Sequence, residues 1–289
     1  MMALGDQFEP EPLKADTLQG DSPSVSPQDA TPKLDPVRPD RLRAGLGVTL
    51  ISVWSWFVFG ACVALWVPLM LITFIVTLPF DRGRYWTGYL YRKLPVVHQM
   101  LNPLWRFRVT GDLPSNPRNP YVVVSNHESF VDILLISHLP WEMKWLSKKQ
   151  LFRVPFAGWL MSLAGDIPLV RGDKASAQQA MDTCAEYLQK RVSVMIFPEG
   201  TRAADGELRQ FKDGAFRLAI ETQTPILPLA VSGTKEAMRK HDWRFGRADA
   251  EVHVLPPVST DGLDLGDVNA LRDLVRTQIA DQLASMKSD

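Results

Sequence analysis

Short apolar runs recur along the chain from residue 107 onward, separated by polar and turn-forming stretches. Several of these runs are continuous rather than alternating, a pattern typical of strands that are buried on both faces of a sheet. The predicted strands cover residues 107–109, 121–125, 143–146, 192–197, 226–231 and 251–255.

Two further segments place apolar side chains three or four positions apart, as they would lie on one face of an amphipathic helix. The residues concerned are Ala177, Met181, Cys184 and Leu188, and then Leu271, Val275, Ile279 and Leu283. Helices that follow and separate buried strands indicate an α/β fold in which a mixed sheet is flanked by helices.

A different pattern fills Ala44 to Phe80, which is apolar on every side and contains no charged residue. As one straight helix it would be about 55 Å long, against roughly 30 Å for the hydrocarbon core of a bilayer. Basic residues lie on both flanks, among them Arg43 and Arg82. Because positive charge favours the cytoplasmic side, both ends are predicted to be cytoplasmic, at the cell membrane.

We therefore expect a helical hairpin that anchors the chain in the membrane, with a break near Gly60 or Pro68. Proline disrupts a helix interior, and two short helices would fit the bilayer better than one long helix. The alternative is a single tilted span with a long continuation in the membrane interface.

Charge and composition divide the chain further. Its formal net charge is zero, but residues 1–40 carry eight acidic and three basic side chains and are rich in proline. Such a segment buries too little apolar surface to order itself, so it is predicted to be a disordered tail. The expected organisation is a tail at 1–40, a membrane-anchoring helical segment at 41–93 and the remaining domain at 94–289. With only two cysteines, no disulfide framework is indicated.

Candidate chemistry follows the second predicted strand, where His127 and Asp132 stand five positions apart. On a regular helix they would point about 140° apart, so they can meet only if His127 lies in a turn and Asp132 in the helix that follows. We expect that helix to begin at Ser129 and to end near His138, with Asp132 at a capping position. Asp132 would then fix the imidazole tautomer, and the other ring nitrogen could take a proton from a substrate hydroxyl. The alternative is a purely structural helix start.

A second candidate follows the strand at 192–197, where Glu199, Gly200, Thr201 and Arg202 stand together. A guanidinium grips phosphate through two parallel hydrogen bonds, and glycine allows a ligand to approach the backbone. Glu199 would accept a hydrogen bond from a substrate hydroxyl or orient Arg202. The alternative is a structural Glu–Arg pair. Further candidate cations are Arg171 and Lys212, although a lone cation is more often a solvated surface charge. No spacing of His, Cys, Asp and Glu suggests a metal site.

Four blocks of this sequence resemble the glycerolipid acyltransferase family, specifically its bacterial 1-acylglycerol-3-phosphate acyltransferases. In order along the chain, the blocks are Asn126 to Asp132, Gly165 to Arg171, Phe197 to Arg202 and Thr224 to Ala230. Four matches in the same order are much more specific than any one of them.

The resemblance implies transfer of a fatty acyl group from acyl-CoA or acyl carrier protein to the sn-2 hydroxyl of lysophosphatidate. His127 would be the base and Asp132 its partner, while Arg171, Glu199, Gly200, Thr201 and Arg202 would bind the phosphorylated acceptor. No cofactor, metal or nucleic acid is expected, and the partners are the two substrates and membrane lipids. Two alternatives remain: an acyltransferase for another lysolipid, and a non-catalytic lipid-binding protein of the same fold.

Overall fold

The computed structural model describes residues 39–202, 207–238 and 243–288. Almost all of the predicted tail at 1–40 lies outside the described residues. Only its last two positions are described, and they already belong to the first helix, α1, which runs from Pro39 to Thr77.

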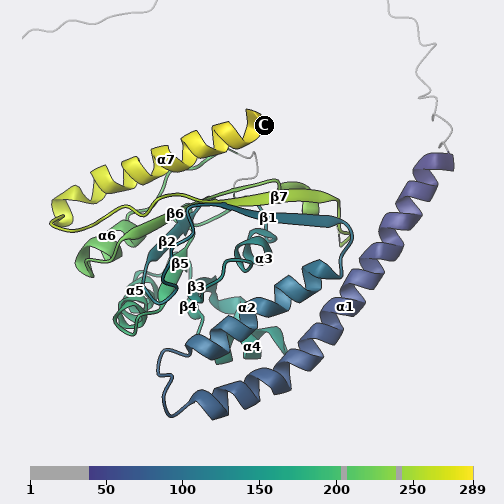
Figure 1. Cartoon of the computed structure of the whole chain (residues 1–289), viewed down its shortest axis with the longest axis horizontal. Coiled ribbons are helices and arrows are strands. Elements are labelled where there is room, and N and C mark those ends of the chain that lie inside the picture. Colours follow the sequence, from purple (N-terminus) through teal and green to yellow (C-terminus); the bar gives the residue numbers. More distant parts are fainter. Residues whose placement is uncertain (1–38, 203–206, 239–242, 289) are drawn as a thin grey trace, which may run out of the picture. The chain divides into compact units, whose positions relative to one another are not determined.

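A seven-stranded sheet forms the centre of the described chain, in the order β1-β7-β6-β2-β5-β3-β4 (Figure 1). The strands are β1 Trp105–Gly111, β2 Val122–Ser125, β3 Met143–Lys148, β4 Ile167–Leu169, β5 Ser193–Ile196, β6 Ile226–Ser232 and β7 Ala248–Val254. All neighbours are parallel except β6 and β7, so the predicted mixed sheet is confirmed. Each of the six predicted runs forms a strand, and β4 was missed as a strand because it is only three residues long.

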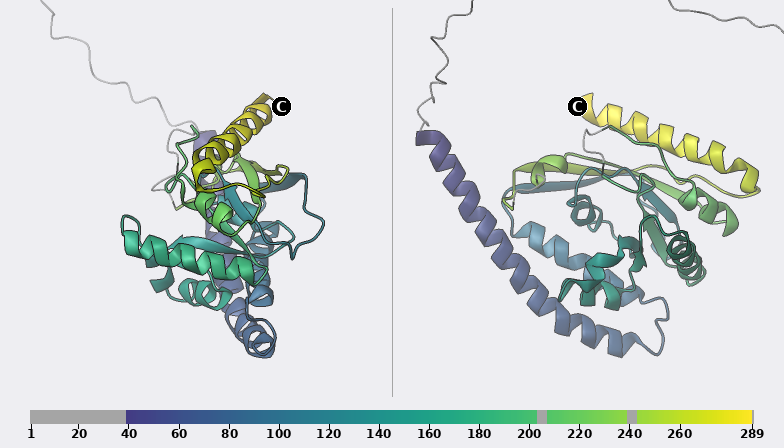
Figure 2. Two further views of the ribbon diagram at one scale, coloured as in Figure 1. Left: turned by 90° about the vertical axis from the view of Figure 1, so that its left-hand side faces the viewer. Right: turned by 180° about the vertical axis from the view of Figure 1, so that it is seen from behind.

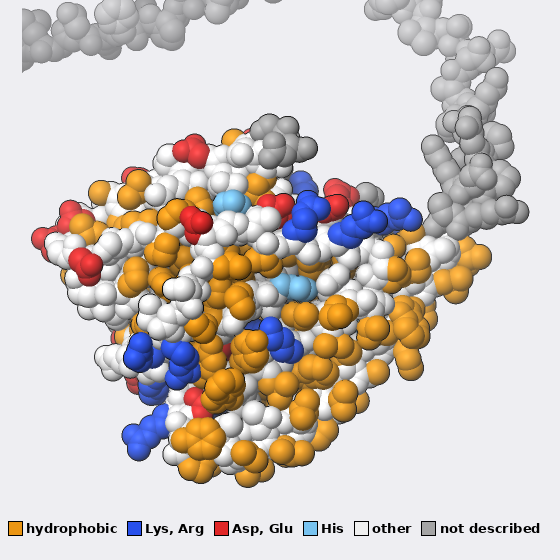
Figure 3. Space-filling model, in the orientation of Figure 1, with side chains coloured by type: hydrophobic (Ala, Val, Ile, Leu, Met, Phe, Trp, Pro, Cys, Tyr) orange, Lys and Arg blue, Asp and Glu red, His pale blue; other side chains and the backbone are white. Residues whose placement is uncertain are grey.

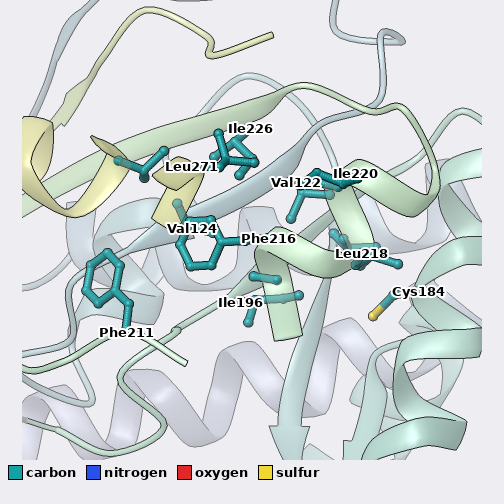
Figure 4. Close-up of a cluster of buried hydrophobic side chains, with 14 of the residues drawn as sticks. Val122, Val124, Cys184, Ile196, Phe211, Phe216, Leu218, Ile220, Ile226 and Leu271 are labelled. Atoms are coloured by element: carbon teal, nitrogen blue, oxygen red, sulfur yellow. The ribbon is translucent and has the colours of Figure 1, made fainter. Parts of the chain in front are cut away.

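The middle of the sheet is buried on both faces, as the continuous apolar runs predicted. All four side chains of β2 and of β5 are buried. One face is covered by α5 (Lys174–Gln189), α6 (Gly214–Glu221) and α7 (Val268–Ser288), which include both predicted amphipathic helices. Figure 4 shows this core, where Phe216 of α6 lies among Val124, Ile196 and Leu271.

The other face carries α3 (Asp132–Ile136) and, beyond it, α2 (Tyr85–Met100) and α4 (Ala157–Ala164) (Figure 2). Short 3-10 turns complete the chain at Lys149–Arg153, Lys235–Ala237 and Leu265–Asp267. The expected boundary after residue 93 falls inside α2, and the segment from Pro39 onward forms one compact unit. The division into an anchor and a domain at that position stays a prediction.

The predicted hairpin is wrong, because α1 is one continuous curved helix that passes through both Gly60 and Pro68 (Figure 1). Both residues lie on the exposed side of the helix. The opposite side carries a buried stripe that continues past Pro68 and packs on α2 and α4, namely Val58, Cys62, Trp66 and Met70. Proline removes one backbone hydrogen bond, whereas the packing of this stripe holds the helix together on both sides of it.

Two leucines offer a matched test of this packing. Leu218 of α6 is 3% exposed and Leu274 of α7 is 49% exposed. We expect Leu218→Ala to lower the free energy of unfolding by about 2–5 kcal/mol, because it leaves a cavity in the core. Leu274→Ala should change it by less than about 1 kcal/mol. Denaturant unfolding in detergent solution measures both, and equal losses would contradict the assigned core.

Candidate active site

The imidazole of His127 and the carboxylate of Asp132 are in direct contact, as predicted. His127 Nδ1 lies 2.7 Å from Asp132 Oδ2, in the loop between β2 and α3. A carboxylate accepts, so Nδ1 carries the proton in this contact and Nε2 is left with its lone pair. His127 is 9% exposed, whereas Asp132 is fully buried.

Asp132 is held by three donors besides the imidazole. Its Oδ2 accepts hydrogen bonds from the backbone N–H groups of Glu128 at 2.7 Å and Ser129 at 3.0 Å. Its Oδ1 accepts a hydrogen bond from the hydroxyl of Thr234, which follows β6. Both oxygens are therefore engaged, and the carboxylate cannot rotate without breaking several bonds. The sequence pattern did not single out Thr234.

The helix after the loop is shorter than predicted. It begins at Asp132 and ends at Ile136, instead of running from Ser129 to about His138. Ser129 starts a turn, in which its hydroxyl accepts a hydrogen bond from the N–H of Val131 at 3.3 Å. Asp132 does accept from the N–H of Ser129, as the capping spacing suggested, but the residues between them form a turn and not a helix.

Neighbouring strand ends fix the loop that carries His127. The side-chain amide of Asn126 bonds to both the N–H and the carbonyl oxygen of Val231 in β6, each at 2.8 Å. The ring of Phe197, just after β5, stacks on the imidazole with centroids 4.0 Å apart. Because β2, β5 and β6 are parallel, their carboxyl ends meet at one edge of the sheet, the usual place for a site in an α/β fold.

Glu199 connects the loop of His127 with the predicted anion site. Its Oε1 accepts from the backbone N–H of His127 at 2.8 Å, and its Oε2 accepts from the N–H of Arg209 at 3.4 Å. Burial raises the pKa of Glu199, and these N–H groups counteract part of that shift. Among the residues that the structure describes, no hydrogen bond or ion pair joins Glu199 to Arg202, and the two expected roles of Glu199, bonding a substrate hydroxyl or orienting Arg202, stay predictions. The oxygens of Glu199 are engaged with backbone because the chain folds back on itself after Gly200.

Gly200 adopts a positive φ of 73° and lies beneath the side chain of Lys212. A Cβ at this position would come within 2.7 Å of the Lys212 ammonium, so only glycine fits here without a shift. The structure thus brings Lys212 to the predicted block. Thr201 and Arg202 are exposed, and the Thr201 hydroxyl accepts a hydrogen bond from Arg209 Nη1 at 3.1 Å.

Arg171 is exposed after β4. Among the residues that the structure describes, no hydrogen bond or ion pair joins Arg171 to His127 or to Phe197–Arg202, here called the Gly200 segment. In the same sequence block, Gly165 to Arg171, Asp166 makes two contacts that hold the fold together. Asp166 pairs with Arg92 of α2 and accepts from the N–H of Trp145 at 3.1 Å, so this part of the block ties α2 to β3. A role for Arg171 in substrate binding stays a prediction.

An apolar cavity of about 310 Å³ lies between α1, α2, α3 and α4. Residues that line it include Phe59, Leu94, Phe130, Val131, Trp145 and Met161. It reaches the candidate site, because Val131 directly precedes Asp132 and the ring of Trp145 lies 6.0 Å from that of Phe197. Sequence patterns could not reveal this cavity, since its walls come from helices far apart in the chain.

Metal binding finds no support in the described part of the chain, where no three His, Cys, Asp or Glu side chains are placed to hold an ion. The site offers an imidazole, a buried carboxylate and the exposed cations Arg202 and Lys212.

Comparison with known proteins identifies the class. A sequence model of the Acyltransferase family matches residues 106–232, which include His127, Asp132 and the Gly200 segment. A crystal structure of the 1-acyl-sn-glycerophosphate (LPA) acyltransferase PlsC from Thermotoga maritima shares the fold, with a TM-score of 0.70. At 22% identity it covers 85% of this chain and 98% of its own.

Relatives with similar sequences show which branch of this family the chain belongs to. The chloroplastic 1-acyl-sn-glycerol-3-phosphate acyltransferase BAT2 of Brassica napus is 32% identical over 92% of this chain and 74% of its own length. The human 1-acyl-sn-glycerol-3-phosphate acyltransferase alpha is 38% identical over 64% of this chain and 66% of its own. The chain therefore belongs to the 1-acyl-sn-glycerol-3-phosphate acyltransferase family, and the predicted resemblance is confirmed.

Glu128, which follows His127 in the chain, has a strongly raised pKa. Burial raises its pKa from 4.5 to about 7, and the charge of Asp132 adds to the effect, while Lys287 and Lys235 oppose it. Between pH 4.5 and 7 the Glu128 carboxyl therefore keeps its proton more in the folded protein than in the unfolded chain. The contribution of this group to stability is lost as pH rises through this window.

Glu128→Gln removes this titration. We expect its unfolding midpoint, measured in detergent at a series of pH values, to rise relative to wild type between about pH 5 and 7 and to run parallel above about pH 8. Glu221→Gln, at an exposed position of α6, controls for the loss of a carboxyl. Parallel profiles for Glu128→Gln and wild type throughout would contradict the raised pKa.

Proposed function

We propose that this chain transfers a fatty acyl group from a thioester donor to the sn-2 hydroxyl of 1-acylglycerol-3-phosphate, giving phosphatidate, with His127 as the general base. The observation that carries this proposal is the 2.7 Å contact between Asp132 and Nδ1 of His127, which leaves Nε2 able to accept a proton. The donor is acyl-CoA or acyl carrier protein, whose shared thioester is all that the chemistry requires.

In this mechanism the acceptor hydroxyl bonds to His127 Nε2 and attacks the thioester carbonyl carbon while its proton passes to the imidazole. The buried carboxylate of Asp132 stabilises the resulting imidazolium. The tetrahedral adduct then expels the thiolate, which takes the proton from the imidazolium. The acyl group moves directly between the two substrates, so no enzyme nucleophile is needed.

The acceptor phosphate would lie against the cations around Gly200. Lys212 covers Gly200, and Arg202 is the second exposed cation of this segment. Arg202 is three residues from Glu199, and the N–H of Lys212 donates to the carbonyl of Pro198 at 2.9 Å; Glu199 in turn bonds to the backbone of His127. A phosphate held here would place the glycerol hydroxyl beside the base, because the glycerol backbone is only a few bonds long.

The apolar cavity supports binding of an acyl chain. Its walls are mostly hydrocarbon and aromatic, and its volume of about 310 Å³ falls within the range of small-molecule sites. It reaches the candidate site at Val131 and Trp145. An acyl chain in this cavity would therefore bring its carbonyl end close to His127.

Another lysolipid acceptor is the rival function, and it would share the same base. Incubation of the purified protein with labelled acyl donor and a panel of lysolipids separates the two. Preferred acylation of lysophosphatidate supports the proposal, whereas preference for a lysolipid with another headgroup would replace it.

His127→Ala and Asp132→Asn should each lower the rate of phosphatidate formation by roughly 10²- to 10⁴-fold, the usual contribution of a positioned base. The reason differs between them, because the first removes the base and the second removes the charge that stabilises the imidazolium. Rates of labelled phosphatidate formation measure both effects. His253→Ala, in β7, should retain near wild-type rates, and an active His127→Ala variant would end the assignment of the base.

The long apolar helix favours membrane association. Residues 45–77 of α1 have the length and composition of a membrane span. Hydrophobic side chains dominate the surface along this helix in Figure 3, and exposed members include Leu65, Ile72 and Ile75. We place the protein at the cell membrane with its active site on the cytoplasmic side.

Contacts along α1 favour a helix that lies in one leaflet instead of crossing the bilayer. The indole N–H of Trp54 donates to the carbonyl of Leu101 at 3.2 Å, and that of Trp66 donates to the carbonyl of Leu90 at 2.8 Å. A helix bound to the folded domain at both places cannot cross the bilayer without carrying the domain into it.

Single cysteines at Leu46 and Phe80 test this topology, since both positions are exposed near the two ends of the apolar stretch. The native Cys62 and Cys184 are buried and unpaired. We expect both introduced thiols to react with a membrane-impermeant reagent added to inside-out vesicles and to be protected in intact cells. Labelling of one end only from outside would show a crossing helix.

A further inference from the structure

Two arginines of the last helix, α7, bond to residues 208–213, which follow the Gly200 segment. Arg276 donates from Nε to the carbonyl of Arg209 at 3.1 Å and from Nη2 to the carbonyl of Leu208 at 3.0 Å. One turn earlier, Arg272 Nη1 binds Asp213 Oδ1 at 2.6 Å. Two arginines of one helix therefore hold both ends of the stretch 208–213.

This stretch carries two cations into the site. Lys212 lies over Gly200, and its N–H donates to the carbonyl of Pro198 at 2.9 Å. Arg209 touches the block twice, through its N–H to Glu199 and through Nη1 to the Thr201 hydroxyl. The other oxygen of Glu199 accepts from the N–H of His127. The carboxylate of Glu199 therefore links Arg209 directly to the loop of the proposed base.

Cations and carboxylates both occur along this stretch, and Asp213 is already paired with Arg272 of α7. The guanidinium of Arg209 is exposed, and in the described structure its only hydrogen-bond partner is the neutral Thr201 hydroxyl. Arg202 and Lys212 bring further positive charge to the same few residues. A guanidinium with free N–H groups binds a phosphate oxygen pair well.

We propose that Arg209 is a further binding residue for the acceptor phosphate, and that Arg276 is the positioning residue that holds it in place. The assignment rests on the proposed function. Arg209 lies in none of the four sequence blocks, and α7 lies beyond residues 106–232 that match the family model. The phosphate site thus includes an element outside the family match.

Steady-state acylation of lysophosphatidate by the full chain in detergent tests this inference. Arg209→Gln keeps a donor for Thr201 but removes the charge, and Arg209→Lys keeps the charge. We expect Arg209→Gln to raise KM for lysophosphatidate about 10- to 100-fold, as loss of a charge-assisted hydrogen bond does, with kcat and the donor KM within about three-fold of wild type. Arg209→Lys should recover part of the loss.

Arg276→Ala should raise the acceptor KM in the same direction but by less. Combined with Arg209→Gln it should add little, because Arg276 acts through Arg209 and coupled residues are not additive. Arg217→Ala, on the exposed side of α6 beside Glu221, is the matched arginine control and should behave as wild type. Should Arg276→Ala fail to fold, the Arg209 variants decide the question alone.

A binding measurement separates this inference from the proposed function. Glycerol 3-phosphate should inhibit competitively against lysophosphatidate, and its inhibition constant should rise in Arg209→Gln as much as KM does. An unchanged acceptor KM in Arg209→Gln, or an equal rise in the donor KM, would overturn the role of Arg209. If wild-type protein does not acylate lysophosphatidate, the proposed function fails instead, and a thermal shift by glycerol 3-phosphate that is lost in Arg209→Gln would still support the anion site.

Discussion

The buried carboxylate of Asp132 is the constraint on which the site depends. Four donors converge on it: the His127 imidazole, the N–H groups of Glu128 and Ser129, and the Thr234 hydroxyl. A buried charge is tolerated only when hydrogen bonds replace its lost water, and here the loop itself supplies them. The same bonds that stabilise the carboxylate therefore set the tautomer and direction of the imidazole.

A second carboxylate, that of Glu199, connects the loop of His127 with the segment that carries the cations. Glu199 joins the N–H of His127 to that of Arg209, so the base and the cationic segment share one rigid connection. The ring of Phe197 stacks on the imidazole, and its centroid lies 6.0 Å from that of Trp145 of β3. The imidazole and one wall of the cavity are thus held against residues at neighbouring strand ends, which suits a reaction between two bound substrates.

Local patterns in the sequence were sufficient for much of this. Continuous apolar runs gave six strands correctly, and the spacing of His127 and Asp132 indicated a turn that brings them together. Contacts between distant segments were not predictable in this way: Thr234 lies 102 residues from Asp132 in the chain, and the sheet brings the two together. The hairpin failed for a related reason, because Pro68 suggests a break locally while packing on α2 and α4 maintains the helix. The tail at residues 1–40 and the role of Arg171 remain predictions.

Buried ion pairs beside the cavity join α2 to β3. Arg92 of α2 pairs with Asp166 and lies 3.5 Å from Glu142, whose other oxygen is 2.9 Å from Lys144 of β3. All four side chains are buried, so removal of any one leaves an uncompensated charge in a medium of low dielectric constant. Such a network favours a single arrangement of α2 on β3 over others that apolar contacts alone would allow. Since Arg92, Asp166 and Trp145 also line the cavity, the network holds part of the cavity wall in place.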